Sequence, residues 1–191
     1  TADFAPHERV SLLNCFITSL FFILVESQKG ENMREASADL QKIRSIADYQ
    51  FGKAVGEKLF PDNVRIVHSG RTGRIRYVYL EEKRLATLRP VDGLFSLSIT
   101  GAKELMKNVK PPRLWVRVTN EVAPFIAKGR SVFAKHVTDA DEEIRPQEEV
   151  IVINGKNEVL AVGKAILSGE EMKAFKRGVA VRTRRGVAKE S

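Results

Sequence analysis

Two apolar runs joined by a short polar turn constrain the fold of this 191-residue chain more than any other feature. The runs are Val150–Ile153 and Val159–Val162, and the residues from Asn154 to Asn157 between them read Asn-Gly-Lys-Asn. An Asn-Gly step favours the positive φ angles of a tight turn, so this segment predicts a β-hairpin. Because neither run alternates with polar residues, both strands should be buried.

The sequence around this hairpin predicts further strands and short helices over residues 112–191. The elements expected there are a strand at Leu114–Val118, a helix at Val122–Lys128, an extended segment from Val132 toward Val137, the hairpin, a helix from Ser168 to Phe175 and a strand at Val179–Thr183. Gly129 should end the first helix, and Ser168 is a good N-cap for the second. About six strands and two helices in this length are typical of a small mixed barrel.

A different pattern occupies residues 39–111, which we expect to form a separate domain. The elements expected there are a helix from Leu40 to Leu59, strands at Val64–Ile66, Ile75–Tyr79 and Leu94–Ile99, and a helix at Gly101–Val109. Pro61 should end the first helix, and Pro111-Pro112 forms a stiff boundary before the barrel. The fold class is therefore α+β, with a small antiparallel sheet in an N-terminal α+β domain and a mixed β-barrel after it.

Residues 1–38 are interpreted as an apolar N-terminal helix and linker. The run Val10–Val25 has 16 residues, of which four are polar. A membrane span needs about 20 apolar residues, so a buried or partner-docking helix is favoured and no membrane partner is expected. A removed or membrane-associated segment is the alternative, although Asp3 and Glu8 before the run are unusual for a signal peptide.

The net charge points to an anionic partner. Lys and Arg total 32 against 24 Asp and Glu, which gives +8 and a pI near 9.7. Nucleic acid is the first candidate for such a chain. The single cysteine, Cys15, excludes an internal disulfide, and its spacing from the histidines fits no zinc site. We therefore expect a reducing, cytoplasmic location, and neither a metal nor a cofactor.

The sequence contains no recognisable catalytic constellation. His7, His68 and His136 have no nucleophile or acid partner in a known motif around them. A cluster of acidic residues could bind a divalent cation, but it lacks the glycine and the terminal glutamate of a calcium loop. A solvated turn is therefore favoured for this cluster, which comprises Asp139, Asp141, Glu142 and Glu143.

Basic residues fall in three clusters. The clusters are Arg71, Arg74 and Arg76 at a glycine-bearing turn, then Lys128, Arg130 and Lys135 near Gly129, and finally Lys176, Arg177, Arg182, Arg184 and Arg185 near the last strand. In a small barrel the first helix and the last strand can border one another, which would merge these clusters into one basic groove. For the turn arginines alone, a solvated basic turn is the alternative. Phe133 and Phe175 are candidates for base stacking, although we expect both to pack in the core.

Several stretches carry a resemblance to a known module. They are Gly129–Lys135, Arg145–Val150, Leu160–Ala165, and Ser168–Met172 with Arg177–Val181. Together they make residues 113–187 similar to a PUA domain, the RNA-binding module named after pseudouridine synthases and archaeosine transglycosylases. Farther upstream, Ala47–Gly52, Ser69–Arg76 and Leu85–Gly93 resemble the region before that domain in archaeosine tRNA-guanine transglycosylases. The related archaeosine synthase has a similar C-terminal half.

This resemblance implies a role in archaeal tRNA modification, with the PUA domain holding the acceptor stem and 3′ end of tRNA. PUA domains usually contact RNA through the loop after the first helix and through the last strand. With the arginines of the glycine-bearing turn added, the implied RNA-binding residues are Lys128, Gly129, Arg130, Ser131, Val132, Phe133, Lys135, Gly178, Val179, Ala180, Arg182, Arg71, Arg74 and Arg76. The catalytic barrel, the nucleophilic aspartates and the cysteine-rich zinc site of that family have no counterpart in this sequence.

Three hypotheses for function follow. The leading one is a non-catalytic protein that binds tRNA or another structured RNA. The second is an accessory subunit of a split archaeosine tRNA-guanine transglycosylase, active only with a separate catalytic chain. In that case the apolar N-terminal helix would dock onto the catalytic subunit or a second copy. The third is a protein-interaction module without RNA binding, on which the basic groove would be incidental.

Overall fold

The computed structural model describes residues 36–109 and 113–189. The chain divides into two units, residues 1–39 and 40–191, and the second contains both sheets. The apolar run at Val10–Val25 and the boundary at Pro111-Pro112 lie outside the described residues. Within the described part of the chain, no helix is long and apolar enough to cross a membrane.

The helix expected from Leu40 to Leu59 is in fact two helices. A first helix covers residues 36–51, and α2 follows at Val55–Leu59. Gly52 ends the first helix with a φ of +113°, a left-handed conformation that glycine adopts without steric cost. The apolar spacing continues across the break because residues from both helices face the same core, where Phe51 and Val55 are buried. The prediction of a single helix was therefore wrong.

Gly56 fixes how α2 returns against the first helix. A Cβ atom at this position would collide with the carbonyl oxygen of Arg44. The Gly56 amide also donates a hydrogen bond of 2.6 Å to the carboxylate of Asp48. The side chain of Asp48 thus satisfies a backbone amide at the start of α2, which locks the turn between the two helices.

An antiparallel sheet with strand order β1-β2-β3-β4 follows in the chain. Its strands are β1 at Val64–His68, β2 at Ile75–Leu80, β3 at Lys83–Leu88 and β4 at Phe95–Leu97. The expected antiparallel sheet is confirmed, but strand β3 was missed. Its burial does not alternate cleanly, and Glu81 occupies the preceding tight turn with a φ of +53° where no glycine or asparagine announces one.

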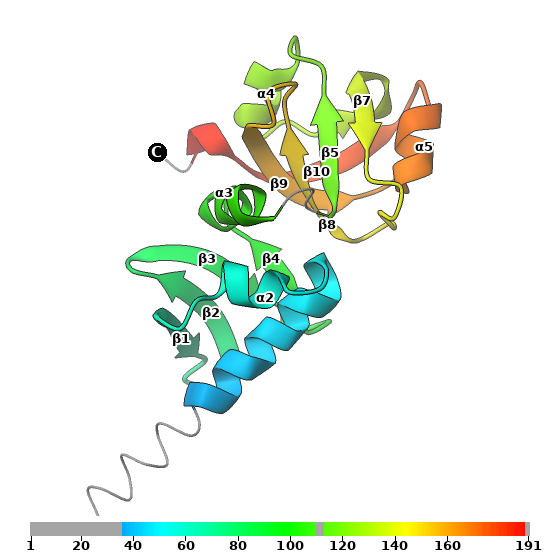
Figure 1. Cartoon of the computed structure of the whole chain (residues 1–191). Coiled ribbons are helices and arrows are strands. Elements are labelled where there is room, and N and C mark those ends of the chain that lie inside the picture. The colour runs from blue at the N-terminus through cyan, green and yellow to red at the C-terminus, as the bar shows by residue number, and fades with distance from the viewer. Residues whose placement is uncertain (1–35, 110–112, 190–191) are drawn as a thin grey trace, which may run out of the picture. The chain divides into compact units, whose positions relative to one another are not determined.

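Helix α3 spans Ile99–Asn108 and lies between this sheet and the barrel, packing against β3 and β9 (Figure 1). Ser98 caps it by accepting a hydrogen bond of 2.9 Å from the Gly101 amide. Ile99 was expected to end a strand but is the first residue of this helix. The cap at Ser98 explains the difference, because it starts the helical turn directly after the three residues of β4.

The second half of the unit is a nearly closed mixed sheet of six strands, in the order β6-β10-β9-β8-β5-β7 (Figure 1). Its elements are β5 at Trp115–Val118, α4 at Ala123–Ala127, β6 at Val132–Phe133, the 3-10 helix η1 at Ala134–His136, β7 at Val137–Ala140, β8 at Glu149–Ile153, β9 at Val159–Ala165, α5 at Gly169–Ala174, β10 at Val179–Gly186 and the 3-10 helix η2 at Val187–Lys189. The expected mixed barrel is confirmed, with β5 and β8 as its parallel pair.

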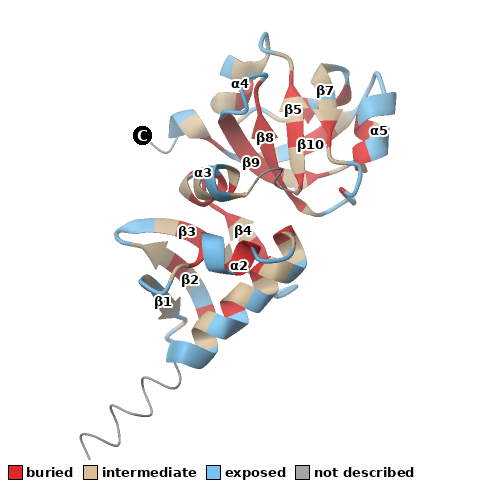
Figure 2. Cartoon of the chain, in the orientation of Figure 1, coloured by how far each residue is buried: buried red, intermediate tan, exposed pale blue. Residues whose placement is uncertain are grey.

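The hairpin predicted from the two apolar runs at Val150–Ile153 and Val159–Val162 forms as expected. Strands β8 and β9 pair in antiparallel fashion, every residue of β8 is buried, and so is every residue of β9 except Lys164 (Figure 2). Asn157 takes a φ of +62° in the turn between them. Two details of the barrel differ from expectation. The extended segment after Val132 is interrupted by η1, and the last strand continues past Thr183 to Gly186.

Candidate nucleic-acid interface

Helix α4 positions the first part of the implied site. Ile126 is buried and anchors the helix, whereas the side chain of its neighbour Phe125 is 58% exposed. The helix ends as predicted at Gly129, which has a φ of +91° and donates its amide to the carbonyl of Ile126 at 2.8 Å. This reversal turns the chain directly into Arg130 and the strand that follows.

Pairing between β6 and β10 brings the two implied RNA-binding segments together. Phe133 pairs with Val179, and Val132 pairs with Val181. Two further hydrogen bonds join the segments, from the Ala134 amide to the Gly178 carbonyl at 3.0 Å and from the Thr183 hydroxyl to the Arg130 carbonyl at 2.9 Å. The residues 128–135 and 178–182 therefore form one continuous surface, which we call the barrel interface.

Exposed cations give the barrel interface its charge. Lys128, Arg130, Lys135 and Arg182 are all exposed. Among the described residues, none of these four cations has a carboxylate within salt-bridge distance. Unpaired lysine and arginine side chains on one face are the usual electrostatic footprint of nucleic-acid binding.

Two of the implied RNA-binding residues cannot contact RNA through their side chains. Val132 and Ala180 are fully buried in the barrel, so these two positions can offer only backbone atoms to a ligand. Gly178 is exposed and has a φ of +97°, and Val179 and Ser131 are half-buried. Val132 and Ala180 thus contribute to the interface only by positioning the backbone. The cations and glycines around them provide the surface that a ligand can contact.

Aromatic residues at this end of the barrel are more exposed than expected. Phe133 is 48% exposed and Phe175 is 47% exposed, so the expectation that both pack in the core was wrong. In the short strand β6, Val132 takes the inward position and Phe133 the outward one, as strand alternation requires. Phe125 was missed altogether, although the inward position of its neighbour Ile126 leaves it facing outward.

The turn arginines form a separate site. A pocket of about 350 Å³ is lined by Arg71, Arg74, Arg76, Arg89 and Lys42, together with several neutral residues. Strands β1 and β2, which flank this turn, lie at the opposite end of the unit from α4 (Figure 1). The expectation of one groove containing all three basic clusters was therefore wrong, because the sheet and α3 separate the turn from the barrel interface.

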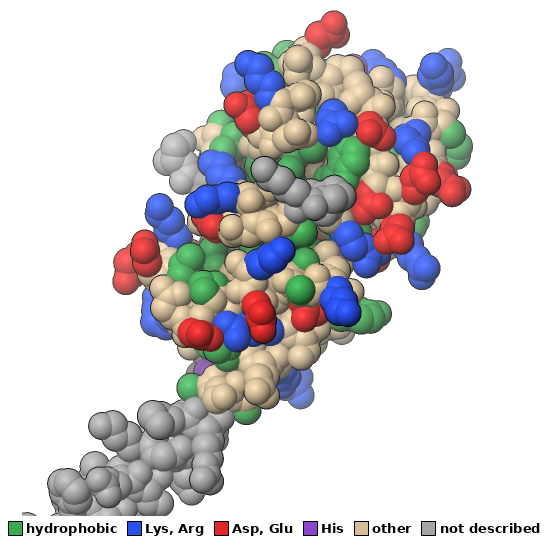
Figure 3. All heavy atoms as spheres, viewed as in Figure 1, with side chains coloured by type: hydrophobic (Ala, Val, Ile, Leu, Met, Phe, Trp, Pro, Cys, Tyr) green, Lys and Arg blue, Asp and Glu red, His purple; other side chains and the backbone are tan. Residues whose placement is uncertain are grey.

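Acidic side chains gather on a different part of the surface, beside α5 (Figure 3). A pocket of about 570 Å³ there is lined by Glu142, Glu143, Glu148, Glu149 and Glu170, with Arg113 and Arg145. Lys173 pairs with Glu142 at 2.5 Å, and Arg113 pairs with Glu143 at 2.6 Å. Glu142 and Glu143 lie in an exposed turn as expected, but Asp139 is in strand β7 and pairs with Arg117 at 3.3 Å, so the solvated-turn interpretation holds for only part of the acidic cluster. Within the described residues, no group of three or more potential metal ligands is present.

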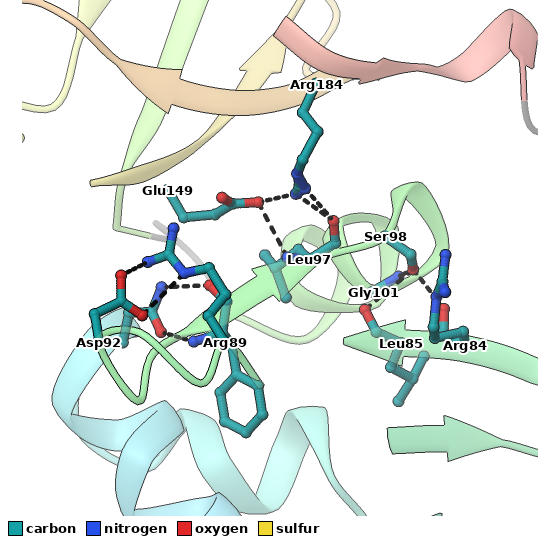
Figure 4. A network of polar contacts seen from close by, with 11 residues as sticks. Arg84, Leu85, Arg89, Asp92, Leu97, Ser98, Gly101, Glu149 and Arg184 are labelled. Carbon is teal, nitrogen blue, oxygen red and sulfur yellow. Dashed lines mark hydrogen bonds and ion pairs between the residues drawn. The ribbon is translucent and has the colours of Figure 1, made fainter. Parts of the chain in front are cut away.

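Glu149, which the sequence did not single out, joins the sheet to the barrel (Figure 4). Its carboxylate is buried, accepts a hydrogen bond of 3.0 Å from the Leu97 amide and pairs with Arg184. Arg184 also donates to the Leu97 carbonyl at 2.7 Å. Burial raises the pKa of Glu149 to about 7, although the Arg184 and Arg89 guanidinium groups oppose that rise. A glutamate that follows the polar residues Gln147 and Glu148 in the sequence gives no signal of such burial.

Comparison with known families gives two matches along the chain. Residues 41–112 match the patch-forming domain C2 of tRNA-guanine transglycosylase, and residues 115–187 match the PUA domain. The two matched regions follow one another in the order that the fold shows, first the four-stranded sheet with its helices and then the barrel.

The two curated relatives described next have the same name. The tRNA-guanine(15) transglycosylase of Methanothermobacter thermautotrophicus is 47% identical over 148 residues, which cover 78% of this chain and 23% of the relative. The enzyme of the same name from Thermoplasma volcanium is 42% identical over 182 residues. This match covers 95% of this chain and 28% of the relative. The chain thus spans about a quarter of the length of these relatives.

Solved structures agree on the fold. A hypothetical protein of Pyrococcus horikoshii is 24% identical with a TM-score of 0.64, and the match covers 78% of this chain and 90% of that one. A conserved PUA domain protein from Thermoplasma acidophilum has a TM-score of 0.58 at 20% identity, covering 79% of this chain and 89% of that one. With the barrel, the two domain matches and the curated relatives taken together, this chain matches the C-terminal region of enzymes named tRNA-guanine(15) transglycosylase, as a patch-forming C2 domain followed by a PUA domain.

Proposed function

We propose that this chain is a non-catalytic RNA-binding protein of archaeal tRNA modification, and that it binds the acceptor stem and 3′ end of tRNA. The pairing of β6 with β10 is the observation that carries this proposal, because it unites residues 128–135 and 178–182 in one cationic surface. The relatives, which are named as tRNA-guanine transglycosylases, support tRNA as the RNA and the cytoplasm as the location.

Binding at the barrel interface would combine three kinds of contact. Arg130, Lys135 and Arg182 would hold phosphates, and Gly129 and Gly178 let the backbone approach the RNA closely. Exposed aromatic rings, chiefly Phe133, would stack on an unpaired base. Phosphate and stacking contacts discriminate little between the four bases, so the shape of the RNA should dominate recognition.

A comparison of nucleic acids tests this proposal. The full chain is titrated with a complete tRNA transcript, the same transcript lacking its 3′ CCA, and a duplex DNA of equal charge, each across a salt series. We expect the complete tRNA to bind most tightly at every salt concentration. Equal and steeply salt-dependent binding of all three would reject acceptor-end recognition and favour a nonspecific basic surface.

Variants locate the contact surface. Arg130→Ala and Lys135→Ala should each weaken tRNA binding and reduce its salt dependence, since each removes one cation from the barrel interface. Arg145→Ala is the matched control, because Arg145 is exposed and lines the acidic pocket instead. If all three variants bind like the unaltered protein, the barrel interface is not the RNA site.

A second candidate function is that of an accessory subunit in a split tRNA-guanine transglycosylase. It is favoured by the similarity of this chain to about the last quarter of enzymes that carry that name. In this proposal residues 1–38 form the docking segment, while 39–111 and 112–191 form the two domains. Copurification distinguishes the candidates, because the accessory role requires a stoichiometric catalytic partner and the independent RNA-binding role does not.

A further inference from the structure

A second basic pocket lies between the four-stranded sheet and the barrel, away from the barrel interface. Its volume is about 360 Å³, and it is lined by Tyr77, Arg84, Thr87, Ser96, Leu97, Ser98, Arg184 and Arg185. These residues come from β2, β3, β4 and β10, together with the N-cap of α3. No carboxylate is among the lining residues, in contrast to the glutamate-rich pocket beside α5.

An irregularity in β10 creates the cationic wall of this pocket. Thr183 pairs with Gly163 and Arg185 pairs with Val162, so Arg184 is an extra residue without a partner on β9. In a regular strand, consecutive side chains point to opposite faces of the sheet. A bulge changes the direction of the side chain at the extra residue. Arg184 and Arg185 therefore line the same pocket although they are consecutive.

The positive charge of the pocket is only partly compensated. Arg184 is committed to Glu149 and to the Leu97 carbonyl. Within the described residues, neither Arg84 nor Arg185 has a carboxylate partner. Arg84 lies with its guanidinium carbon 5.6 Å from the centre of the Tyr77 ring, which holds the side chain at the pocket wall.

We propose that this pocket binds a backbone phosphate of the same RNA that the barrel interface binds, with Arg84 and Arg185 as its ligands. The inference rests on the proposed function and adds a second contact to it. Guanidinium groups present fixed pairs of N–H donors that match phosphate oxygens. The hydroxyl groups of Thr87 and Ser96 line the pocket and can donate further hydrogen bonds.

The course of β10 supports a strand of RNA over a free phosphate compound. The strand carries Val179 and Arg182 at the barrel interface and Arg185 at the pocket. Arg182 pairs with Lys164 and Arg185 pairs with Val162, so the two arginines lie two residues of β9 apart, which is roughly 7 Å at a rise of about 3.3 Å per residue. One RNA molecule on the barrel interface can therefore reach the pocket without leaving the protein surface.

Single charge-removing variants test the pocket. Arg84→Gln and Arg185→Gln should each weaken binding of the tRNA transcript several-fold at low salt. Each lost phosphate contact should also reduce the slope of log affinity against log salt by about 0.7–0.9. Arg145→Gln is the matched control and should leave both quantities unchanged. Arg84→Lys and Arg185→Lys keep the charge, so they should retain most of the salt slope.

The outcomes separate the two proposals. If the unaltered chain does not bind tRNA, the proposed function and the pocket both fail. If Arg130→Ala weakens binding while Arg84→Gln and Arg185→Gln bind as the unaltered chain does, the pocket alone is overturned.

A parallel titration with inorganic phosphate and adenosine monophosphate identifies the source of the phosphate group. Weakened binding of these small compounds in Arg84→Gln, with unchanged tRNA affinity, would mean a site for a free phosphate compound and overturn the RNA assignment. Weakened tRNA binding in both glutamine variants supports the RNA assignment, provided that the fluorescence of Trp115 in β5 shows an unchanged fold.

Discussion

Glu149 is the clearest case of a residue whose chemistry is set by its neighbours. Its carboxylate is 99% buried, and only Oε1 finds partners, in Arg184 and the Leu97 amide. Oε2 has no hydrogen-bond partner among the described residues, and neither does the buried Nη1 atom of Arg89. Burial favours the neutral form of a carboxyl group, whereas the nearby arginine favours the charged form. Burial dominates here, and the pKa of Glu149 rises to about 7.

The raised pKa predicts a pH-dependent stability with a definite sign. Between pH 4.5 and about 7 the folded state keeps a proton on Glu149 that the unfolded state has released. Raising the pH through this window therefore lowers the free energy of unfolding, by roughly 3 kcal/mol at about 1.4 kcal/mol per pKa unit. Urea unfolding at several pH values should show a flatter profile for Glu149→Gln than for the unaltered chain. Parallel profiles would contradict the assignment.

Two glycines give a matched pair of substitutions at the residue scale. A methyl group at Gly56 would meet the backbone of Arg44, whereas nothing lies within 4 Å of the corresponding position at Gly70. Gly56→Ala should therefore lower the free energy of unfolding by about 1–3 kcal/mol, as overpacking does. Gly70→Ala should change it by less than about 0.5 kcal/mol. Equal effects in chemical denaturation would refute the close packing of α2 on the first helix.

At the scale of the element, helix α5 depends on its first residues. The Ser168 side chain accepts from the Glu171 amide, and the Glu171 carboxylate accepts from the Ser168 amide at 2.8 Å. Such a capping box satisfies two amides that a six-residue helix would otherwise expose.

Removing the cap should be measurable in the stability of the whole barrel. Ser168→Ala is expected to lower the free energy of unfolding by about 1 kcal/mol, because α5 packs against β7 and loses its start. Ser45→Ala is the control, since the exposed Ser45 hydroxyl bonds only to the Gln41 carbonyl within its own helix. If Ser45→Ala lowers the free energy of unfolding as much as Ser168→Ala does, the cap itself contributes nothing to stability.

Elements with strong local signals were predictable, and elements without them were not. The β8–β9 hairpin, the N-cap at Ser168 and the helix end at Gly129 all follow from turn and capping chemistry that acts within a few residues. The apolar periodicity does not reveal the break between the two helices at Gly52, because apolar residues of both helices pack into the same core. Strand β3 gave no signal because its turn uses Glu81 in a left-handed conformation.

At the scale of the whole molecule, the sheet and the barrel share one hydrophobic core. The buried cluster runs continuously from Ile43 to Val181, with α3 packed against β9 and β4 against β8. The C2 domain and the PUA domain should therefore unfold together.

The distribution of aromatic residues makes that cooperativity easy to measure. The one tryptophan, Trp115, is in the barrel, and the three tyrosines, Tyr49, Tyr77 and Tyr79, are all in the preceding domain. Tyrosine absorbance and Trp115 fluorescence should give the same denaturation midpoint. Arg184→Gln, which weakens the contact with Glu149 and Leu97, should lower both midpoints together, and Arg182→Gln should lower neither. Two separate midpoints would mean that the domains fold independently.

The sequence by itself determined the order of the two domains, the barrel and the segments that form the barrel interface. Those features depend on hydrophobic period, turn chemistry and motif order, which are all local along the chain. Only the tertiary structure decided that the turn arginines stand apart, that Phe133 faces outward, and that the bulge at Arg184 forms a pocket with Arg84. These results depend on contacts between residues as far apart as Leu97 and Arg184, and no local pattern encodes the partner of a distant residue.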